Sequence, residues 1–115
     1  YPFDVRLDDT GNNPVRMAEK CADFLEEAKN RPFFLYFCPT DPHRTGVRRD
    51  LPFQPNAHGN RPNGHEGVTE TLYGADSLRV PYFLPNTPES RAELAQYYQS
   101  VSRLDQGVVH RQVGA

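Results

Sequence analysis

The sequence predicts an α/β fold, and three features indicate it. A helical pattern covers residues 15–29, an apolar run at residues 33–37 reads as a buried strand, and a second helical pattern begins at residue 88. A strand that is apolar on both faces is typical of a sheet covered by helices on each side. We therefore expect the element order helix, buried strand, long loop, helix.

The first helix has a clear start signal. Asn13 is a good N-cap and Pro14 suits the first helical position. Apolar residues then recur at spacings of three and four, which is typical of an amphipathic helix with one packed face. The members of this face are Ala18, Cys21, Ala22, Leu25 and Ala28. The helix is expected to end at Asn30 and Arg31, immediately before Pro32.

The strand leads into a polar turn. The run Phe33-Phe34-Leu35-Tyr36-Phe37 lies between prolines and is followed by Asp41-Pro42-His43-Arg44. Ligands of open α/β sheets bind just outside the carboxyl ends of the strands. The turn is therefore the candidate functional site.

Three side chains of this turn are the candidate site residues. His43 is the candidate catalytic residue, because an imidazole can donate to an anionic oxygen or protonate a leaving group near neutral pH. An imidazole that only hydrogen-bonds within its own turn fits the position equally well. Arg44 could clamp an anion with its fork of donors, or simply pair with a carboxylate. Asp41 could orient the imidazole or cap the turn. His43, Arg44 and Asp41 together form the predicted substrate-binding set.

The remaining histidines and the cysteines offer weaker signals. His58 and His65 fit no tight metal-ligand spacing and are expected to be solvated loop residues. Cys21 and Cys38 are expected to be buried thiols without a bridge between them. No Gly-rich phosphate loop and no common hydrolase motif occurs. We therefore predict no metal ligand in this chain.

A long segment rich in Gly, Pro, Asn, His and Arg separates the strand from the second helix. Residues 45–78 contain only isolated apolar residues and are expected to form an irregular loop around the site. Thr87 should cap the second helix, with Pro88 at its first position. The apolar stripe of that helix is predicted to comprise Leu94, Tyr97, Tyr98, Val101, Leu104 and Val108.

Composition bounds the class of protein. The 115 residues suffice for one small domain, and the net charge of −2 gives no reason to expect nucleic acid or an acidic membrane surface as a partner. No signal peptide or membrane span is recognisable.

Four stretches in order resemble the sulfatase family, most closely its sulfamidase branch. They are Tyr1-Pro2-Phe3-Asp4, the strand with Asp41-Pro42-His43-Arg44, Val80-Pro81-Tyr82-Phe83-Leu84-Pro85-Asn86-Thr87-Pro88, and Tyr97-Tyr98 through Arg103-Leu104-Asp105-Gln106-Gly107-Val108. The resemblance covers residues 1 to about 108. The turn and the Val80–Pro88 stretch are fairly specific only in combination.

The resemblance implies an alkaline-phosphatase-like α/β fold and hydrolysis of a sulfate ester or sulfamate on a sugar, with N-sulfoglucosamine of heparan-type chains the expected substrate. It also implies a calcium ion and a formylglycine made from a cysteine. At the position of His43 the family has a pocket histidine that touches the sulfo group. A periplasmic, secreted or lysosomal location would follow.

The family's nucleophile motif and its calcium ligands are not found in this sequence. Residues 1–115 are therefore expected to be a partial sulfatase domain that is inactive alone, with both groups supplied elsewhere in a full-length parent. Asp8-Asp9 is not assigned to calcium, since it precedes a helix. Two other readings remain open: a non-catalytic module that binds anionic sugars, and a phosphodiesterase or phosphonate hydrolase of the same superfold.

Overall fold

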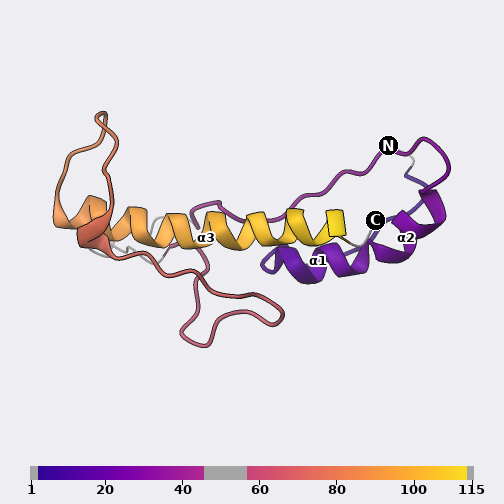
Figure 1. Cartoon of the computed structure of the whole chain (residues 1–115), viewed down its shortest axis with the longest axis horizontal. Helices are drawn as coiled ribbons and strands as arrows, with labels where there is room; N and C mark the ends of the chain where they lie inside the picture. Colours follow the sequence, from indigo (N-terminus) through magenta and orange to yellow (C-terminus); the bar gives the residue numbers. More distant parts are fainter. Residues whose placement is uncertain (1–2, 46–56, 114–115) are drawn as a thin grey trace.

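The computed structural model describes residues 3–45 and 57–113, with side chains described as far as residue 110. The chain is elongated, measuring 51 × 30 × 29 Å along its principal axes. Its elements are α1 (Pro14–Lys20), α2 (Ala22–Ala28), the short 3-10 helix η1 (Ala75–Ser77) and α3 (Pro88–Val113). Figure 1 shows α3 as the long axis of the molecule, with α1 lying alongside its C-terminal half. The described residues contain no β-strand.

The predicted start of the first helix is confirmed. The Asn13 side chain accepts a hydrogen bond from the Arg16 backbone N–H at 3.1 Å and donates to the Glu66 carbonyl at 2.8 Å. Pro14 occupies the first position of α1. The single helix expected over residues 15–29 is instead divided at Cys21 into α1 and α2. Asn13 thus caps a helix and ties it to a distant loop.

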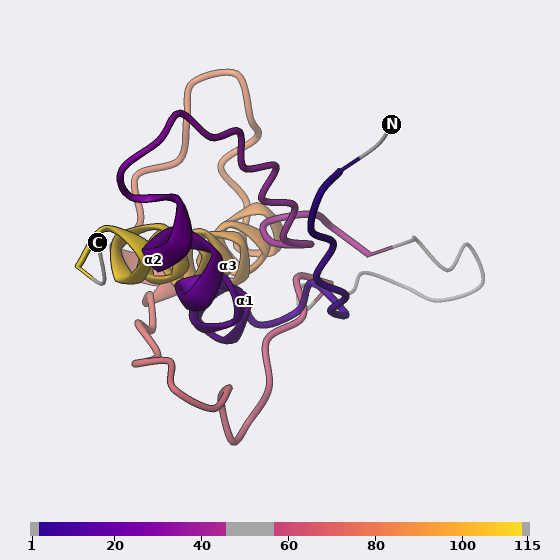
Figure 2. The same cartoon turned by 90° about the vertical axis from the view of Figure 1, so that its right-hand side faces the viewer.

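The helices α1 and α3 pack closely where Pro14 meets Gly107. Both residues are buried, and a Cβ added to Gly107 would lie only 2.4 Å from the Pro14 Cβ. The absence of a side chain at Gly107 therefore permits this approach. Figure 2, viewed nearly along α3, shows α1 lying against it.

The predicted start of α3 is also confirmed. The Thr87 hydroxyl accepts a hydrogen bond from the Ser90 backbone N–H at 3.2 Å, and Pro88 opens the helix. The predicted apolar stripe is covered only in part: Leu94 is buried, Tyr98, Val101, Leu104 and Val108 are half-buried, and Tyr97 is exposed. The buried residues of α3 are Leu94 and a set of small or polar residues, namely Ala95, Gln99, Ser100, Arg103 and Gly107. Polar contacts therefore hold much of the chain against α3.

The predicted buried strand at residues 33–37 is wrong for this structure. The segment is not a strand, and Phe34 and Tyr36 are 75% and 71% exposed. Cys38 is likewise exposed, whereas Cys21 is buried as expected. A strand needs a neighbour for its backbone N–H and C=O groups, and the described residues supply no second strand. The α/β class is accordingly not confirmed.

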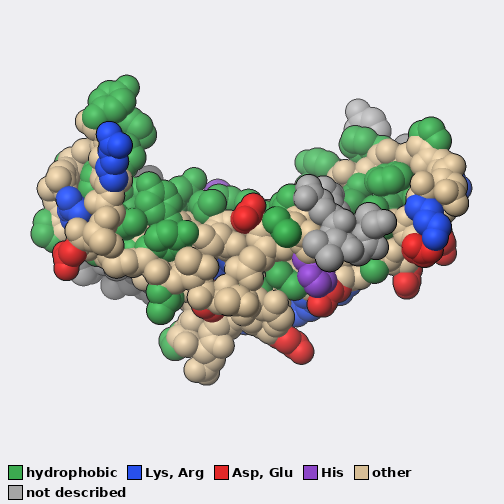
Figure 3. Space-filling model, in the orientation of Figure 1, with side chains coloured by type: hydrophobic (Ala, Val, Ile, Leu, Met, Phe, Trp, Pro, Cys, Tyr) green, Lys and Arg blue, Asp and Glu red, His purple; other side chains and the backbone are tan. Residues whose placement is uncertain are grey.

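The described part of the long loop, residue 45 and residues 57–78, has η1 as its one regular element. Residues 46–56, which include Arg48-Arg49, lie outside the described residues. Arg91 of α3 holds η1 in place by donating to the carbonyls of Ala75 and Leu78 at 3.2 and 2.8 Å. Hydrophobic side chains cover the tip of the loop that leads into α3 (Figure 3), where Tyr82 is 99% and Phe83 70% exposed. No described helix is both long and apolar enough to cross a membrane.

Candidate functional site

The turn at residues 41–44 is held against α3 by a buried ion pair. Arg103 donates from Nε to Asp41 Oδ2 at 2.7 Å and from Nη2 to Asp41 Oδ1 at 2.8 Å. Ser100 Oγ donates to Asp41 Oδ1 at 3.0 Å. Both charged residues are buried, Arg103 to 1% exposure and Asp41 to 7%. Paired, planar geometry of this kind is the strong form of the Arg–carboxylate contact.

The same guanidinium also holds the loop that follows residue 56. Arg103 Nη1 donates to Asn60 Oδ1 at 2.7 Å, and Nη2 donates to the His58 carbonyl at 2.9 Å. Asn60 Nδ2 in turn donates to the Gln96 carbonyl at 2.9 Å. Arg103 therefore holds both the turn that contains Asp41 and the loop that contains His58 and Asn60 against α3, although both segments are far from α3 in the sequence.

Arg44, at the other end of the turn, is paired with Glu93 of α3. Arg44 Nε donates to Glu93 Oε1 at 2.6 Å, and His58 Nε2 lies 3.0 Å from the same oxygen. Burial raises the pKa of the Glu93 carboxyl, but the hydrogen bonds from Arg44 and His58 outweigh it and hold the pKa below its usual range. The carboxylate in turn raises the pKa of Arg44. Glu93 therefore stays ionised and fixes one side of the Arg44 fork.

His43 lies between these two anchored residues. Its side chain is exposed, and its backbone N–H donates to the Thr40 carbonyl at 2.8 Å. The structure thus gives the three candidate residues different settings. Asp41 is enclosed, Arg44 is half-buried against α3, and the His43 ring faces outward. Their catalytic and substrate-binding roles stay predictions.

The prediction that His58 and His65 are solvated loop residues is wrong. They are only 4% and 8% exposed. His58 packs edge-on against Tyr97 with ring centroids 5.6 Å apart, and His65 Nδ1 lies 3.2 Å from Glu70 Oε1. The loop composition gave no sign of this burial, because it depends on α3: Tyr97 belongs to α3, and Glu70 accepts a hydrogen bond from Gln99 of α3 at 2.8 Å.

The residues that position the turn were missed as well. Arg103 and Glu93 carry ordinary helix-surface chemistry in the sequence, and Arg103 pairs with a residue 62 positions away. The sequence resemblance included Arg103 but assigned it no partner. No local spacing could have found this pair.

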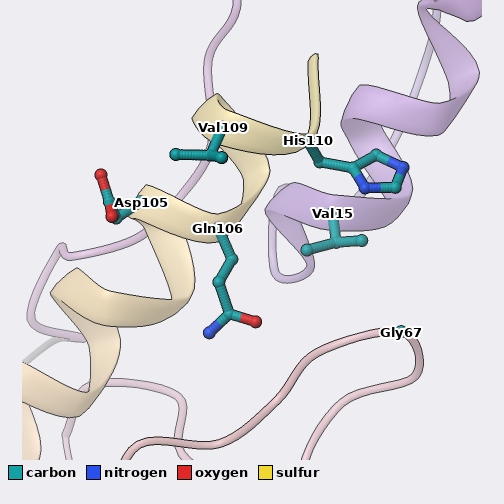
Figure 4. A pocket seen from close by; sticks show the side chains of 6 residues that line it. All are labelled: Val15, Gly67, Asp105, Gln106, Val109 and His110. Carbon is teal, nitrogen blue, oxygen red and sulfur yellow. The ribbon is translucent and has the colours of Figure 1, made fainter. Parts of the chain in front are cut away.

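The hollow drawn in Figure 4 lies away from the turn. Residues of α1, α3 and the loop at Gly67 line it, namely Val15, Gly67, Asp105, Gln106, Val109 and His110.

No group of three or more His, Cys, Asp or Glu side chains suited to a metal ion occurs among the described residues. Asp9 is engaged by Arg16 and Lys20 at 2.9 and 2.7 Å.

One comparison confirms the resemblance to the sulfatases. A curated sulfohydrolase is 37% identical to this chain over 94% of the chain's residues, which supports a relationship to the sulfatases. That protein is the human N-sulphoglucosamine sulphohydrolase, of which the 121 aligned residues make up 24%. The chain thus spans about a quarter of the length of this relative. No protein-family model matches the chain, and no solved structure matches it significantly.

Proposed function

We propose that this chain is the His43-bearing part of a sulfohydrolase that acts on sulfated sugars, with N-sulfated glucosamine as the substrate. The observation that carries the proposal is the 37% identity to human N-sulphoglucosamine sulphohydrolase across almost the whole chain. The comparison does not favour the alternatives of a sugar-binding module or a phosphodiesterase. The exposed imidazole on an anchored turn supports a site that opens toward a ligand.

The proposed roles follow from the settings of the three turn residues. His43 is exposed and would donate a proton to the leaving nitrogen or oxygen of the substrate. Arg44 would present a guanidinium to the sulfo group from an orientation set by Glu93. Both oxygens of Asp41 already accept hydrogen bonds from Arg103, so Asp41 would serve the site by holding the turn.

The finer fold proposal is an alkaline-phosphatase-like α/β fold, in which residues 33–37 form a strand beside strands from elsewhere in the protein. Two features support it. Three consecutive apolar residues of this segment, Phe33, Phe34 and Leu35, are at least partly exposed here, an arrangement that costs free energy in water. Most of the apolar stripe of α3 is also incompletely covered. Both surfaces would be buried by further elements of a sulfatase fold.

The residues described do not fit the calcium ion or the formylglycine that the family uses. The described residues hold no suitable ligand cluster, and neither cysteine has the family's motif. The 115-residue chain by itself is expected not to hydrolyse N-sulfated glucosamine.

The test of this proposal is steady-state kinetics of His43→Ala in the full-length protein, with release of sulfate from N-sulfoglucosamine as the measurement. Loss of a positioned proton donor should lower kcat by about 10²-fold. His110→Ala is the matched control, because His110 is also exposed but lies at the far end of α3. A His43→Ala variant with the kcat and kcat/KM of the wild type would contradict the assignment.

A further inference from the structure

We propose that Arg103 is a positioning residue for the reaction, which sets the place of the His43 imidazole through its ion pair with Asp41. This inference rests on the proposed function of His43. It concerns a residue of α3 that would not itself contact the substrate.

The first support is that the guanidinium nitrogens of Arg103 all donate hydrogen bonds to groups within the protein. Its Nε, Nη1 and Nη2 reach Asp41, Asn60 and the His58 carbonyl at distances of 2.7 to 2.9 Å. The side chain is 1% exposed, so a substrate has no access to it. A planar guanidinium held at every nitrogen fixes the carboxylate opposite it in both distance and direction.

The second support is the way the turn is anchored on its other side. Thr40 donates from its backbone N–H to the Gly11 carbonyl at 2.7 Å and from Oγ1 to the Thr10 carbonyl at 3.3 Å. Gly11 adopts a φ of 76°, which a residue with a side chain rarely adopts, and a Cβ there would lie 2.4 Å from Thr40 Oγ1. Thr40 is therefore fixed by the segment before α1, and Asp41 by α3.

The position of His43 follows from these two anchors. The His43 backbone N–H closes the turn by donating to the Thr40 carbonyl at 2.8 Å. Only Pro42 lies between Asp41 and His43, so a shift of the Asp41 carboxylate would move the backbone that carries the imidazole. A displacement of about 1 Å of a catalytic group can cost on the order of 10²-fold in rate. The buried pair is thus placed to control catalysis without joining it.

The experiment is a double-mutant cycle between Arg103→Lys and His43→Ala in the full-length protein, assayed on N-sulfoglucosamine. Lysine keeps the charge but cannot make the paired contact with Asp41. We expect Arg103→Lys to lower kcat about tenfold or more in the wild-type background, with KM changed less than about threefold. In the His43→Ala background the same change should lower kcat less than about twofold, since no imidazole remains to be positioned.

Arg91→Lys is the matched control. Arg91 lies on the same helix and also holds a loop by several hydrogen bonds, but that loop carries η1 and not the turn. Its effect on kcat should be small and equal in both backgrounds. If Arg103→Lys does not fold, Ser100→Ala replaces it in the cycle, because it removes only one donor to Asp41.

The outcomes separate this inference from the proposed function. If His43→Ala lowers kcat by about 10²-fold but Arg103→Lys has the same effect with and without His43, the positioning role of Arg103 is overturned and the proposed function stands. A His43→Ala variant with wild-type kcat overturns the proposed function, and this inference with it. A loss that appears only when His43 is present supports both.

Discussion

Replacement of Gly107 by alanine should destabilise the packing of α1 on α3. An added Cβ would lie 2.4 Å from the Pro14 Cβ and 2.6 Å from the Pro14 carbonyl carbon. Carbon atoms in contact are normally about 3.5–4.0 Å apart. The two helices would therefore have to separate by roughly 1 Å, since the atoms met are a proline ring and backbone.

The magnitude follows from two opposing effects. Overpacking of this kind costs about 1–3 kcal/mol, and the contact with backbone places Gly107→Ala toward the upper part of that range. Alanine in place of glycine within a helix returns about 1 kcal/mol. We expect a net loss of about 1–2 kcal/mol in the free energy of unfolding. Gly107→Val should lose more, because valine gains less in helix propensity and adds two further methyl groups.

Urea unfolding followed by circular dichroism measures this loss. Asp105→Ala is the control, because Asp105 is exposed on the same helix and gains helix propensity without meeting Pro14. The control should match or slightly exceed the stability of the wild type. A Gly107→Ala variant that is as stable as the wild type would show that α1 and α3 do not meet at Pro14.

Three further predictions follow from individual side chains. Arg16 and Lys20 hold the pKa of the Asp9 carboxyl well below its usual value of 3.8, so Asp9→Asn should be less stable than the wild type at neutral pH. The lowered pKa of Asp9 stabilises the folded state at pH values above the pKa of the unfolded chain, and this stabilisation is lost as pH falls through the folded-state pKa. The difference in stability between the wild type and Asp9→Asn should therefore shrink below about pH 4. His58→Ala should lower the free energy of unfolding by about 1–3 kcal/mol, since it removes a buried ring and a partner of Glu93. Cys38 should react rapidly with a thiol reagent in the folded 115-residue chain.

Each of these has its own control. Asp8→Asn should leave the pH dependence of stability unchanged, because Asp8 and its partner Arg6 are both 82% exposed. His110→Ala, at an exposed position, should change stability far less than His58→Ala, and equal losses would contradict the burial of His58. Cys21 should react only after unfolding, so two fast thiols in the native chain would refute the described packing of α1.

The sequence determined the features that depend on neighbouring residues. Asn13-Pro14 and Thr87-Pro88 were recognisable as helix starts because a cap and the N–H groups it satisfies lie within three residues of each other. The sulfatase resemblance was likewise carried by short contiguous stretches, and the identity to the human relative bears it out. The candidate turn was found in the same way.

Tertiary structure alone decided what surrounds that turn. The pairing of Asp41 with Arg103 joins residues 62 positions apart, and the burial of His58 depends on where α3 lies. The strand prediction failed for a related reason. An apolar run indicates that a segment could be buried, but its backbone becomes a strand only beside another strand, and the described residues provide none. Local sequence patterns therefore determined where the helices begin. The burial of side chains and the pairing of charged groups depended on residues far away in the sequence, which a local pattern cannot identify.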